Sequence, residues 1–388
     1  MVLQKNNHPN LAILSTSQNA YSETFIQAHK QIPDVNVRYY YGDPYPVFLE
    51  DKGALERSLW ISVFLHLSGR IMGSKFVDRR EGLLFRSLHR EKIDCVLAEY
   101  GVTGANVLNV CKKGKLPLIV TFFGYEISAY QVVKQYQQSY VEMFQYASAI
   151  VIVSQHMRQR LENLGCPADK IHFSPSGPHE IFFEVQPKLS EKLFVSTGRF
   201  VDKKAHYYTI LAFDLVLKKY PDARLIIAGD GLLMNTCVNL VRHLKIEHAV
   251  SFPGVITLQE FATHLAVACA YVQHSITALS GDMEGTPVAV MESSAAGVPV
   301  VSTRHAGIPD VVIDGETGLL VDEHDVNGMA QAMLKLLEDR ELAVAMGEKG
   351  RKFILENFSR QKHLNLLSRI VLETASQNTD VRRSWLKK

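Results

Sequence analysis

The chain has 388 residues, of which 47% are hydrophobic and 21% are charged, and its formal net charge at pH 7 is +2. This length suits two domains that each bury their own core, and the composition is that of a soluble globular protein. The nearly balanced charge indicates no global electrostatic preference for nucleic acid, so we expect no nucleic-acid partner.

The cysteine content and the apolar runs indicate where the protein works. Five cysteines are scattered along the chain without a CxxC pair, which predicts reduced thiols and argues against a disulfide framework or a metal site. The polar N-terminus lacks the apolar region of a signal peptide. The longest nearly apolar run, 59–67, is far shorter than the ~20 residues of a membrane-spanning helix. We therefore expect a cytoplasmic protein that is soluble or lies at the inner face of the membrane.

In the first half of the chain, short runs rich in Val, Ile and Leu alternate with helical patterns. The predicted strands are 11–15, 35–41, 94–99, 116–122, 149–154 and 170–174, and the helices between them include 102–113, 127–147 and 155–164. Such alternation predicts a parallel sheet with helices on both faces. A Pro-containing stretch without a regular period, 175–189, predicts the boundary between two domains.

The segment 57–90 stands out within this half. It carries seven Arg or Lys residues against two acidic residues, interleaved with Trp60, Phe64, Phe76 and Phe85. A basic amphipathic surface of this kind can lie on anionic lipid, where each nearby cation adds ~1 kcal/mol. The alternative is an ordinary helix whose apolar residues join the core and whose cations are solvated. Both interpretations stay open, and the first predicts a peripheral membrane contact.

The second half repeats the plan of the first. Its predicted strands are 193–197, 224–228, 250–252, 270–274, 298–302 and 318–321, and two or three helices follow from about 325. The predicted fold class is therefore α/β, with two doubly wound parallel sheets. Because ligands bind beyond the carboxyl ends of the strands in such sheets, two facing sheets place a cleft between them.

Two glutamates eight residues apart, Glu284 and Glu292, mark the most informative stretch. A helix is predicted to begin between them, with Thr286 as its N-cap, and to end at Gly297. Glu284 lies in the loop that leads into this helix. Because helical side chains lean toward the N-terminus, the Glu292 side chain can reach back to the start of the helix, near Glu284. A Glu-x7-Glu pair on its own more often has only a structural role, so its neighbours decide the interpretation.

The start of this helix offers two kinds of chemistry at once. Free N–H groups and the helix dipole suit a phosphate, and carboxylates suit the hydroxyls of a sugar or a ribose. The combination predicts a nucleotide sugar, with Glu284 on the transferred sugar and Glu292 on the ribose. The predicted backbone contacts are Gly285, Thr286, Pro287 and Val288.

The residues around the two glutamates carry a more specific signal. Residues 281–321 read GDMEGTPVAVMESSAAGVPVVST followed by RHAGIPDVVIDGETGLLV. This run resembles the donor-site signature of the retaining glycosyltransferases of family 4, and a weaker resemblance extends over most of the chain. The N-terminal ILSTSQNAYSETFIQAH is most similar to the exopolysaccharide-assembly branch of that family.

The resemblance implies a GT-B fold, in which two Rossmann-like domains face a central cleft. It implies an acceptor-binding domain at 1–182, a nucleotide-sugar-binding domain at 183–360, and a C-terminal helix at 361–388 that crosses back to the first domain.

Cations follow the strand at 193–197 in the sequence GRFVDKKA, in which Ala205 stands where the family usually has Gly. Arg199 and Lys204 match the family's diphosphate ligands, and they offer a fork and a point charge for phosphate oxygens. As exposed cations, they are expected to contribute little to stability.

Three further positions are assigned to the nucleotide side. Gly229, in AGDGLL, and the main chain near Val255, in FPGVI, are placed there by the resemblance. A turn glycine and an ordinary strand end are the alternative explanations for these two. The N–H of Gly307, in HAGIPD, is expected to meet a phosphate or sugar oxygen.

The first domain departs from the family at TFFGYEIS, 121–128. Phe123 occupies the place of a His that lies near the donor sugar in the family, and Phe cannot act as an acid or a base. Either the role is dispensable, or Glu126 or Tyr125 compensates for the missing imidazole, or the activity is altered.

The implied activity is that of a retaining hexosyltransferase. It would move a hexosyl unit from a nucleoside-diphosphate sugar to a hydroxyl of a glycan, lipid-linked or small-molecule acceptor, in the synthesis of cell-surface polysaccharide or glycoconjugates. A UDP-sugar is the favoured donor and a GDP-sugar the alternative, and no metal or other cofactor is expected. Glu284, Arg199 and Lys204 are the predicted catalytic residues. Two alternatives stay open: a GT-B sugar-nucleotide isomerase, and a catalytically silent GT-B partner subunit.

Overall fold

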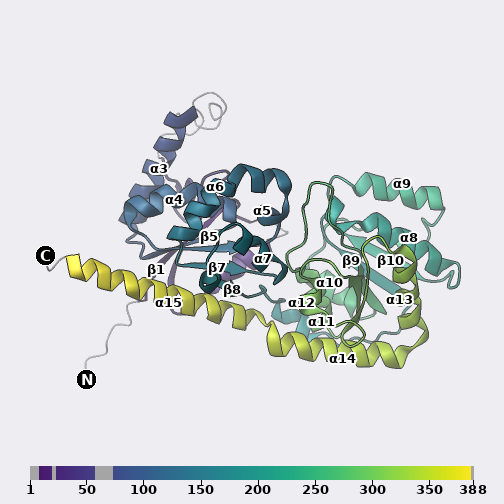
Figure 1. Ribbon diagram of the computed structural model, residues 1–388. Coiled ribbons are helices and arrows are strands. Elements are labelled where there is room, and N and C mark those ends of the chain that lie inside the picture. The colour runs from purple at the N-terminus through teal and green to yellow at the C-terminus, as the bar shows by residue number, and fades with distance from the viewer. Residues whose placement is uncertain (1–7, 20–22, 57–72, 386–388) are drawn as a thin grey trace, which may run out of the picture.

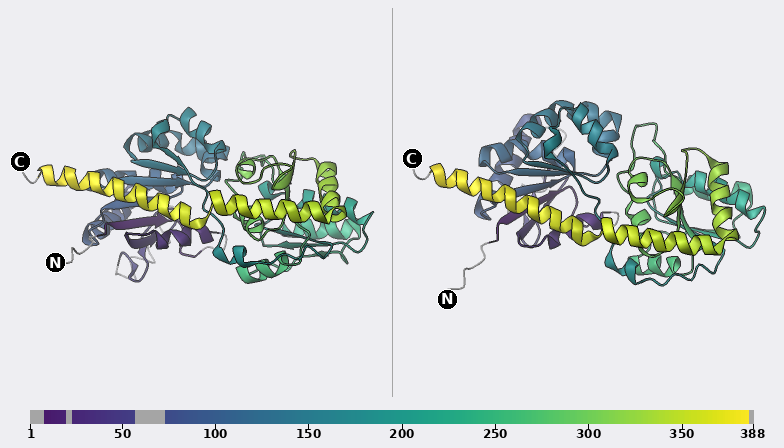
Figure 2. Two further views of the ribbon diagram at one scale, coloured as in Figure 1. Left: turned by 90° about the horizontal axis from the view of Figure 1, so that it is seen from below. Right: turned by 60° about the horizontal axis from the view of Figure 1, so that its bottom comes forward.

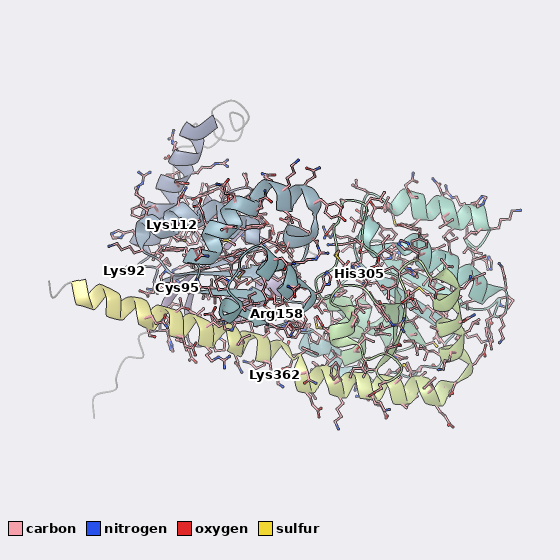
Figure 3. All side chains as sticks on the ribbon, in the orientation of Figure 1. Lys92, Cys95, Lys112, Arg158, His305 and Lys362 are labelled. Carbon is pink, nitrogen blue, oxygen red and sulfur yellow. The ribbon has the colours of Figure 1, made fainter. Side chains whose placement is uncertain are left out.

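Two β-sheets form the centres of two α/β domains that lie side by side along the molecule (Figure 1). The computed structural model describes residues 8–19, 23–56 and 73–385. The five cysteines are free and buried, as expected, and Cys95 lies inside the first domain (Figure 3).

The first sheet has eight strands in the order β4-β3-β2-β1-β5-β6-β7-β8. They are β1 (Asn10–Ser15), β2 (Asn36–Tyr41), β3 (Phe48–Leu49), β4 (Gly53–Ala54), β5 (Cys95–Glu99), β6 (Leu118–Phe122), β7 (Ala149–Ile152) and β8 (Ile171–Phe173). All neighbours are parallel except β3, which pairs antiparallel with β2 and β4. The sequence pattern does not predict β3 and β4, because two-residue strands are too short to show a period.

The strand β1 shows why the central strands read as continuous apolar runs. Ala12 and Leu14 belong to the core on one face of the sheet, and Leu11 and Ile13 belong to the core on the other face. All four are fully buried, since successive side chains alternate between two faces that helices cover.

The helices of the first domain lie on both faces of its sheet. They are α1 (Thr24–Ala28), α3 (Gly73–Arg90), α4 (Gly101–Gly114), α5 (Tyr125–Ser128), α6 (Tyr130–Tyr146) and α7 (His156–Asn163), with 3-10 turns at His29–Gln31 and Ala168–Lys170. A further 3-10 turn, Glu180–Glu184, follows in the linker and packs on the second domain through Phe182. The single helix expected at 127–147 is two helices, because Ala129 between them has an extended backbone with ψ 117°.

The described part of 57–90 is a helix that packs on the domain. In α3, Leu84 and Leu88 are 0% and 1% exposed within the core, and Arg86 is exposed. From residue 79 to 90 the segment therefore fits the alternative of an ordinary amphipathic helix. Residues 57–72 and the side chain of Phe76 lie outside the described part of the structure, and a membrane contact there stays a prediction.

The second sheet has six parallel strands in the order β11-β10-β9-β12-β13-β14. They are β9 (Leu193–Thr197), β10 (Arg224–Ala228), β11 (Val250–Ser251), β12 (Ala270–Gln273), β13 (Val300–Thr303) and β14 (Gly318–Val321). The helices around it are α8 (His206–Leu217), α9 (Met234–Leu244), α10 (Leu258–Leu265), α11 (Val288–Ala295), α12 (Ile308–Val311), α13 (Val326–Glu338) and α14 (Arg340–Asn357), with a 3-10 turn at Asp202–Lys204. Three of the predicted strands, β9, β10 and β14, have the predicted bounds.

Both sheets reverse their winding direction once. The reversal falls between β1 and β5 in the first sheet and between β9 and β12 in the second. Ligands of doubly wound sheets bind beyond the carboxyl ends of the strands at such a point. Each domain therefore directs a ligand-binding edge toward the same region between the domains.

The last helix, α15 (Arg360–Trp385), runs along the first domain, and α14 covers the second. The two helices lie end to end along one side of the molecule (Figure 2). Leu367 and Val371 of α15 are fully buried in the core cluster that contains Leu11 and Ile13.

The α14–α15 junction also meets the linker between the domains. A Cβ atom on Gly177, whose φ is 73°, would lie 2.4 Å from the backbone nitrogen of Arg360. The two segments at which the chain passes between the domains are therefore in contact, and glycine is needed there because no side chain fits.

A chain of buried polar side chains joins α15 to the first domain. His363 Nδ1 lies 2.8 Å from Ser174 Oγ, His363 Nε2 lies 2.8 Å from His29 Nε2, and His29 Nδ1 lies 2.6 Å from Glu99 Oε1. Because the two Nε2 atoms face each other, one ring must accept a hydrogen bond and stay neutral. Burial and the neighbouring His29 hold the pKa of His363 well below its ordinary value.

This chain of contacts predicts a loss of stability at acidic pH. Since the folded pKa of His363 is lower than the unfolded value of about 6.5, the unfolded chain binds more protons below that pH, and the free energy of unfolding falls. His363→Gln should flatten the decline between about pH 7 and 5.5 in urea unfolding experiments. His243→Gln, at an exposed position, should keep the wild-type slope. Equal slopes for wild type and His363→Gln would contradict the assignment.

Candidate active site

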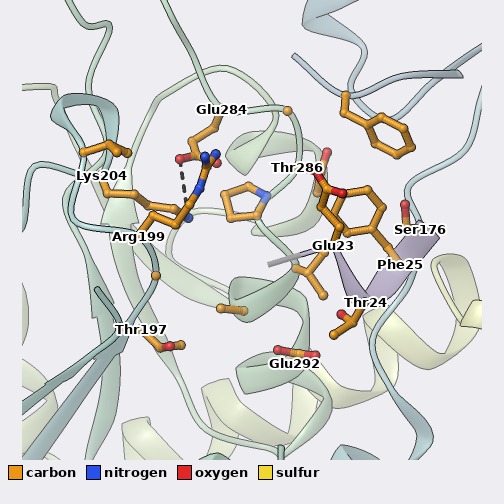
Figure 4. A pocket seen from close by; sticks show the side chains of 18 of the residues that line it. Glu23, Thr24, Phe25, Ser176, Thr197, Arg199, Lys204, Glu284, Thr286 and Glu292 are labelled. Carbon is orange, nitrogen blue, oxygen red and sulfur yellow. Dashed lines mark ion pairs between the residues drawn. The ribbon is translucent and has the colours of Figure 1, made fainter. Parts of the chain in front are cut away.

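A cavity lies between the domains, where the carboxyl ends of the two sheets meet. Its lining residues follow β1, β5, β6, β7 and β8 of the first sheet and β9 to β12 of the second. Of the predicted site residues, those that line it are Arg199, Lys204, Gly229, Val255, Glu284, Gly285, Thr286, Pro287, Val288 and Glu292. Arg199, Lys204 and Glu284 lie together on one side, and Glu23, Phe25 and Ser176 lie on the other (Figure 4).

The helix start between the two glutamates differs by one residue from the prediction. Helix α11 begins at Val288, with Pro287 as the flanking residue and no side-chain cap. The hydroxyl of Thr286 donates to the carbonyl of Val153 in the first domain, so a contact between domains replaces the predicted cap. Gly297, with φ 74°, follows the helix end as predicted.

Two glycines let the loop before α11 pass through a narrow space. A Cβ atom on Gly285 would lie 2.2 Å from the carbonyl oxygen of Phe123, across the domain boundary. Gly307 lies behind the loop, outside the cavity lining, and its N–H donates to the carbonyl of Gly285 at 3.1 Å. That N–H is therefore engaged by the protein, and Gly307 supports the loop instead of presenting a donor to the cavity.

Further hydrogen bonds hold this loop to the first domain. Met283 N–H donates to Ser128 Oγ at 3.1 Å, and Tyr130 N–H donates to the carbonyl of Ser280 at 2.9 Å. On the other side of the loop, Asp310 Oδ2 accepts from the N–H of Gln155 at 2.8 Å. The loop between β12 and α11 therefore forms part of the contact between domains, and both domains fix its position.

Lys204 Nζ and Glu284 Oε1 form an ion pair at 3.4 Å on the side of the cavity that the second domain forms (Figure 4). The side chains are only 13% and 8% exposed. Burial alone would raise the pKa of Glu284, but the charges of Lys204 and Lys203 hold it below its ordinary value. The expectation that both predicted cations are exposed is therefore wrong for Lys204, because the 3-10 turn at the end of β9 directs its side chain inward.

Arg199 remains the exposed cation. It follows β9 directly, lines the cavity, and forms no ion pair with any residue that the structure describes. The turns after β9 and β10 approach closely here, since a Cβ atom on Gly229 would lie 2.0 Å from the carbonyl oxygen of Gly198. Gly229 therefore makes room for the turn that carries the Arg199 side chain.

Glu292 is a buried carboxyl group at the floor of the cavity. Its residue is 6% exposed, and its side chain makes no hydrogen bond with a described residue. Burial raises the pKa of Glu292 to about 7. A buried polar group without partners is unfavourable, so the arrangement suits a ligand that brings hydroxyl donors.

His305 contacts the predicted site residue Glu284, and the sequence predicts no role for it in the site. Its Nε2 accepts from the backbone N–H of Glu284 at 3.1 Å, and its Nδ1 lies 2.6 Å from Glu323 Oε1. The ring is fully buried, and the acceptor role of Nε2 places its proton on Nδ1. His305 therefore positions the backbone of Glu284. Its place directly after β13, at the ligand-binding edge, was the one available signal.

The first domain supplies an aromatic wall. The ring of Phe123 lies 4.7 Å from that of Phe25 and 5.0 Å from that of Tyr100, measured between centroids. Glu126 is fully buried beneath this wall and accepts from the N–H groups of Phe123 and Gly124, at 2.7 and 3.0 Å. Burial raises the pKa of Glu126 to about 7. Glu126 does not line the cavity, whereas Tyr125 does, so of these two only Tyr125 can compensate there for the absent imidazole.

Sequence reasoning also missed several lining residues whose roles depend on the tertiary structure. They are Glu23, Thr24, Phe25, Tyr100, Ser176 and Thr197. The described residues contain no group of three or more His, Cys, Asp or Glu side chains that could hold a metal ion. Among the helices that the structure describes, none is long and apolar enough to cross a membrane.

Comparison with known proteins identifies relatives of both halves. Residues 179–353 match the family model described as glycosyl transferases group 1, and residues 55–178 match that of glycosyltransferase family 4. The putative colanic acid biosynthesis glycosyltransferase WcaL of Escherichia coli is 30% identical, over 70% of this chain and 68% of its own. A GDP-mannose-dependent alpha-(1-6)-phosphatidylinositol monomannoside mannosyltransferase of Mycolicibacterium smegmatis is 30% identical, over 55% of this chain and 59% of its own.

Solved structures share the fold at low sequence identity. Anabaena Alr3699/HepE in complex with UDP-glucose has a TM-score of 0.73 at 14% identity and covers 95% of this chain and 100% of its own. Sucrose-phosphate synthase from Thermosynechococcus elongatus has a TM-score of 0.72 at 16% identity, over 98% of this chain and 99% of its own.

Two parallel-sheet domains that face a cleft, with ligand-binding loops at the carboxyl ends of both sheets, define a glycosyltransferase of the GT-B fold. Within that class, the chain belongs to glycosyltransferase family 4. The fold and the family that residues 281–321 predict are confirmed.

The buried ion pair predicts different effects for the two cations. Lys204→Ala leaves the buried Glu284 carboxylate without its partner, which should lower the free energy of unfolding by about 3–5 kcal/mol. Arg199→Ala, at the exposed position, should change it by less than about 0.5 kcal/mol. Adding Glu284→Gln to Lys204→Ala should recover part of the loss, because the uncompensated charge is removed. Denaturant titration measures all three, and an unchanged Lys204→Ala protein would contradict the pairing.

Proposed function

We propose that this protein is a retaining hexosyltransferase that uses a nucleoside-diphosphate sugar as donor. The observation that carries the proposal is the Glu292 carboxyl group, which is buried, makes no hydrogen bond with a described residue, and lines the same cavity as Arg199 and the Lys204–Glu284 pair. A ribose would satisfy such a carboxylate with two hydroxyls, and the cations would meet the diphosphate.

The second domain holds the donor in this proposal. Arg199 forms no ion pair with a residue that the structure describes, and its guanidinium can bind two phosphate oxygens at once. Lys204 and the backbone N–H groups of Gly285, Thr286 and Val288, at the start of α11, add positive potential at the leaving phosphate. Glu284 orients the transferred sugar through its hydroxyls. The main chain near Val255 faces the base.

The proposed reaction is a displacement on one face of the sugar. The acceptor hydroxyl oxygen forms a bond to the anomeric carbon while the bond from that carbon to the β-phosphate oxygen breaks. The departing phosphate takes the hydroxyl proton, since Phe123 cannot accept one and Glu126 is directed away from the cavity. Attack from the face that the leaving group occupies retains the anomeric configuration. The protein contributes positioning and the stabilisation of charge on the diphosphate.

Relatives support a donor class and a biological setting. WcaL of Escherichia coli and AmsK of Erwinia amylovora are glycosyltransferases of colanic acid and amylovoran biosynthesis. We therefore propose synthesis of cell-surface polysaccharide or glycoconjugate, with a glycan or a lipid-linked acceptor at the inner face of the membrane. A UDP-sugar is the proposed donor because Alr3699/HepE binds UDP-glucose, and a GDP-sugar is the alternative because the mycobacterial relatives are GDP-mannose-dependent.

We propose the functional units 1–182 for the acceptor, 183–360 for the donor and 361–388 for the returning helix. We also propose that the reaction requires no metal.

Phe123 is the observation that favours a second candidate, a catalytically silent partner subunit. The complete set of donor-side groups favours the enzyme. An isomerase would need an acid and a base near the sugar, and Glu126 is buried behind the aromatic wall.

Incubation with labelled UDP-, GDP- and ADP-sugars, with and without acceptors and with EDTA, separates the three functions. Transfer or hydrolysis by wild type, lost in Glu284→Ala, supports the enzyme. Inert wild type with transfer restored in Phe123→His would support the silent subunit.

The two glutamates predict different losses. Glu292→Gln should weaken free nucleoside diphosphate and intact donor alike, because both contain the ribose. Glu284→Gln should leave the free nucleotide's affinity within about twofold and reduce turnover of the intact donor. Calorimetric titration with UDP and steady-state rates measure the two effects, and identical profiles for the two variants would contradict the division of roles.

Donor affinity should also depend on pH through Glu292. The ionised carboxylate accepts the ribose hydroxyls, so below its pKa of about 7 each binding event must first release a proton. Affinity for a nucleotide sugar should then fall up to about tenfold per pH unit below that pKa. A nucleotide sugar is the suitable probe because its diphosphate diester does not titrate in this range. Glu292→Gln should bind more weakly but without this slope, and a slope that persists in the variant would contradict the role of Glu292.

A further inference from the structure

The two domains contribute opposite chemistry to the cavity. The three cations that line it, Arg199, Lys203 and Lys204, all come from the second domain. Among the described lining residues of the first domain there is no Lys, Arg or His, and Glu23 is the one charged side chain. Apart from Glu23, that side consists of aromatic residues with a few small or hydroxyl-bearing ones. The second domain also contributes the carboxyl groups of Glu284 and Glu292, so its side of the cavity carries both signs of charge. On the first domain's side the one described charge is negative and would repel an anion.

Glu23 is held in place by hydroxyl groups. Tyr100 Oη donates to Glu23 Oε1 at 2.8 Å, and Ser17 Oγ donates to Glu23 Oε2 at 2.7 Å. Each carboxylate oxygen has two lone pairs, so each can accept one more hydrogen bond from a molecule in the cavity. Burial and the charge of Glu23 raise the pKa of Tyr100 well above its ordinary value, so its hydroxyl remains a donor.

The backbone conformation of Tyr100 indicates that the fold holds its hydroxyl in this orientation toward Glu23. Tyr100 directly follows β5, beside the point where the first sheet reverses, and its φ is 73°. A bulky residue rarely adopts that conformation, and strained positions of this kind concentrate at functional sites. Here the strain places one hydroxyl on Glu23 and packs the ring edge-on against Phe123, 5.0 Å between centroids.

We infer that Glu23 binds the acceptor and that the acceptor presents an uncharged sugar ring at this position. Two adjacent ring hydroxyls donate to the two free lone pairs of Glu23, and an apolar face of the ring packs on Phe25, Phe123 or Tyr125. A phosphate or carboxylate at this position of the acceptor would meet the Glu23 charge without a cation from the first domain. The inference rests on the proposed function, and it names the class of acceptor.

The experiment compares matched acceptors on the intact protein. The probes are octyl glucoside, octyl galactoside and octyl mannoside, each paired with its uronic acid counterpart, and the donor is the nucleotide sugar found active in the panel. Neutral glycosides should be used at least tenfold better than the uronides in kcat/KM. Glu23→Gln should raise the acceptor KM at least tenfold. It should also reduce the ratio of kcat/KM for neutral glycosides to kcat/KM for uronides. Its affinity for UDP should stay within twofold of wild type. Glu142→Gln, exposed on α6, is the control and should match wild type.

A binding measurement keeps the inference testable if turnover is slow or a variant is unstable. Saturation-transfer NMR on the UDP-loaded protein should show the neutral glycosides bound in wild type and weakened in Glu23→Gln. Tyr100→Phe, which removes one orienting hydroxyl, should weaken them less. Equal use or binding of neutral and uronic probes, or an unchanged acceptor KM in Glu23→Gln, would overturn the inference and leave the proposed function standing. Failure of wild type to bind any nucleoside diphosphate would overturn both.

Discussion

The buried contact between the Lys204 ammonium and the Glu284 carboxylate is the interaction on which the cavity depends. Removing two charges from water is costly, and attraction between them offsets that cost only when the surroundings hold both groups in place. The surroundings do so from several directions. Lys203 donates to Asp282 and to the carbonyl of Met283, and His305 accepts from the backbone N–H of Glu284.

The same requirement explains why the loop between β12 and α11 contacts the first domain. At Gly285 its backbone lies so close to the carbonyl group of Phe123 that no side chain would fit between them. Its polar groups form hydrogen bonds with Ser128, Tyr130 and Val153. A loop free to move would leave a carboxylate in an apolar environment without its partner. The geometry of the second domain's side of the cavity is thus maintained in part by residues of the first domain.

How much of this could be read from the sequence depended on how local each signal was. Strands such as 193–197 and 224–228 were predicted with their bounds, because a buried parallel strand is a continuous apolar run. The donor loop was recognised because its glycines, Pro287 and two glutamates are close together in the chain. The burial of Lys204 and the role of His305 depend on side chains from distant segments, so no local pattern shows them. Thr286 looked like a cap because the sequence does not reveal that Val153 competes for its hydroxyl.

The contact between Gly177 and the backbone of Arg360 constrains how the two domains can move. The polypeptide crosses between the domains twice, and the crossings touch, so together they act as one pivot and not as two separate tethers. A rotation about that point would open the cleft by separating the loop between β12 and α11 from Ser128 and Tyr130. In the proposed function, one rotation about this point would uncover both halves of the cavity, which would couple release of the spent nucleotide to exchange of the acceptor.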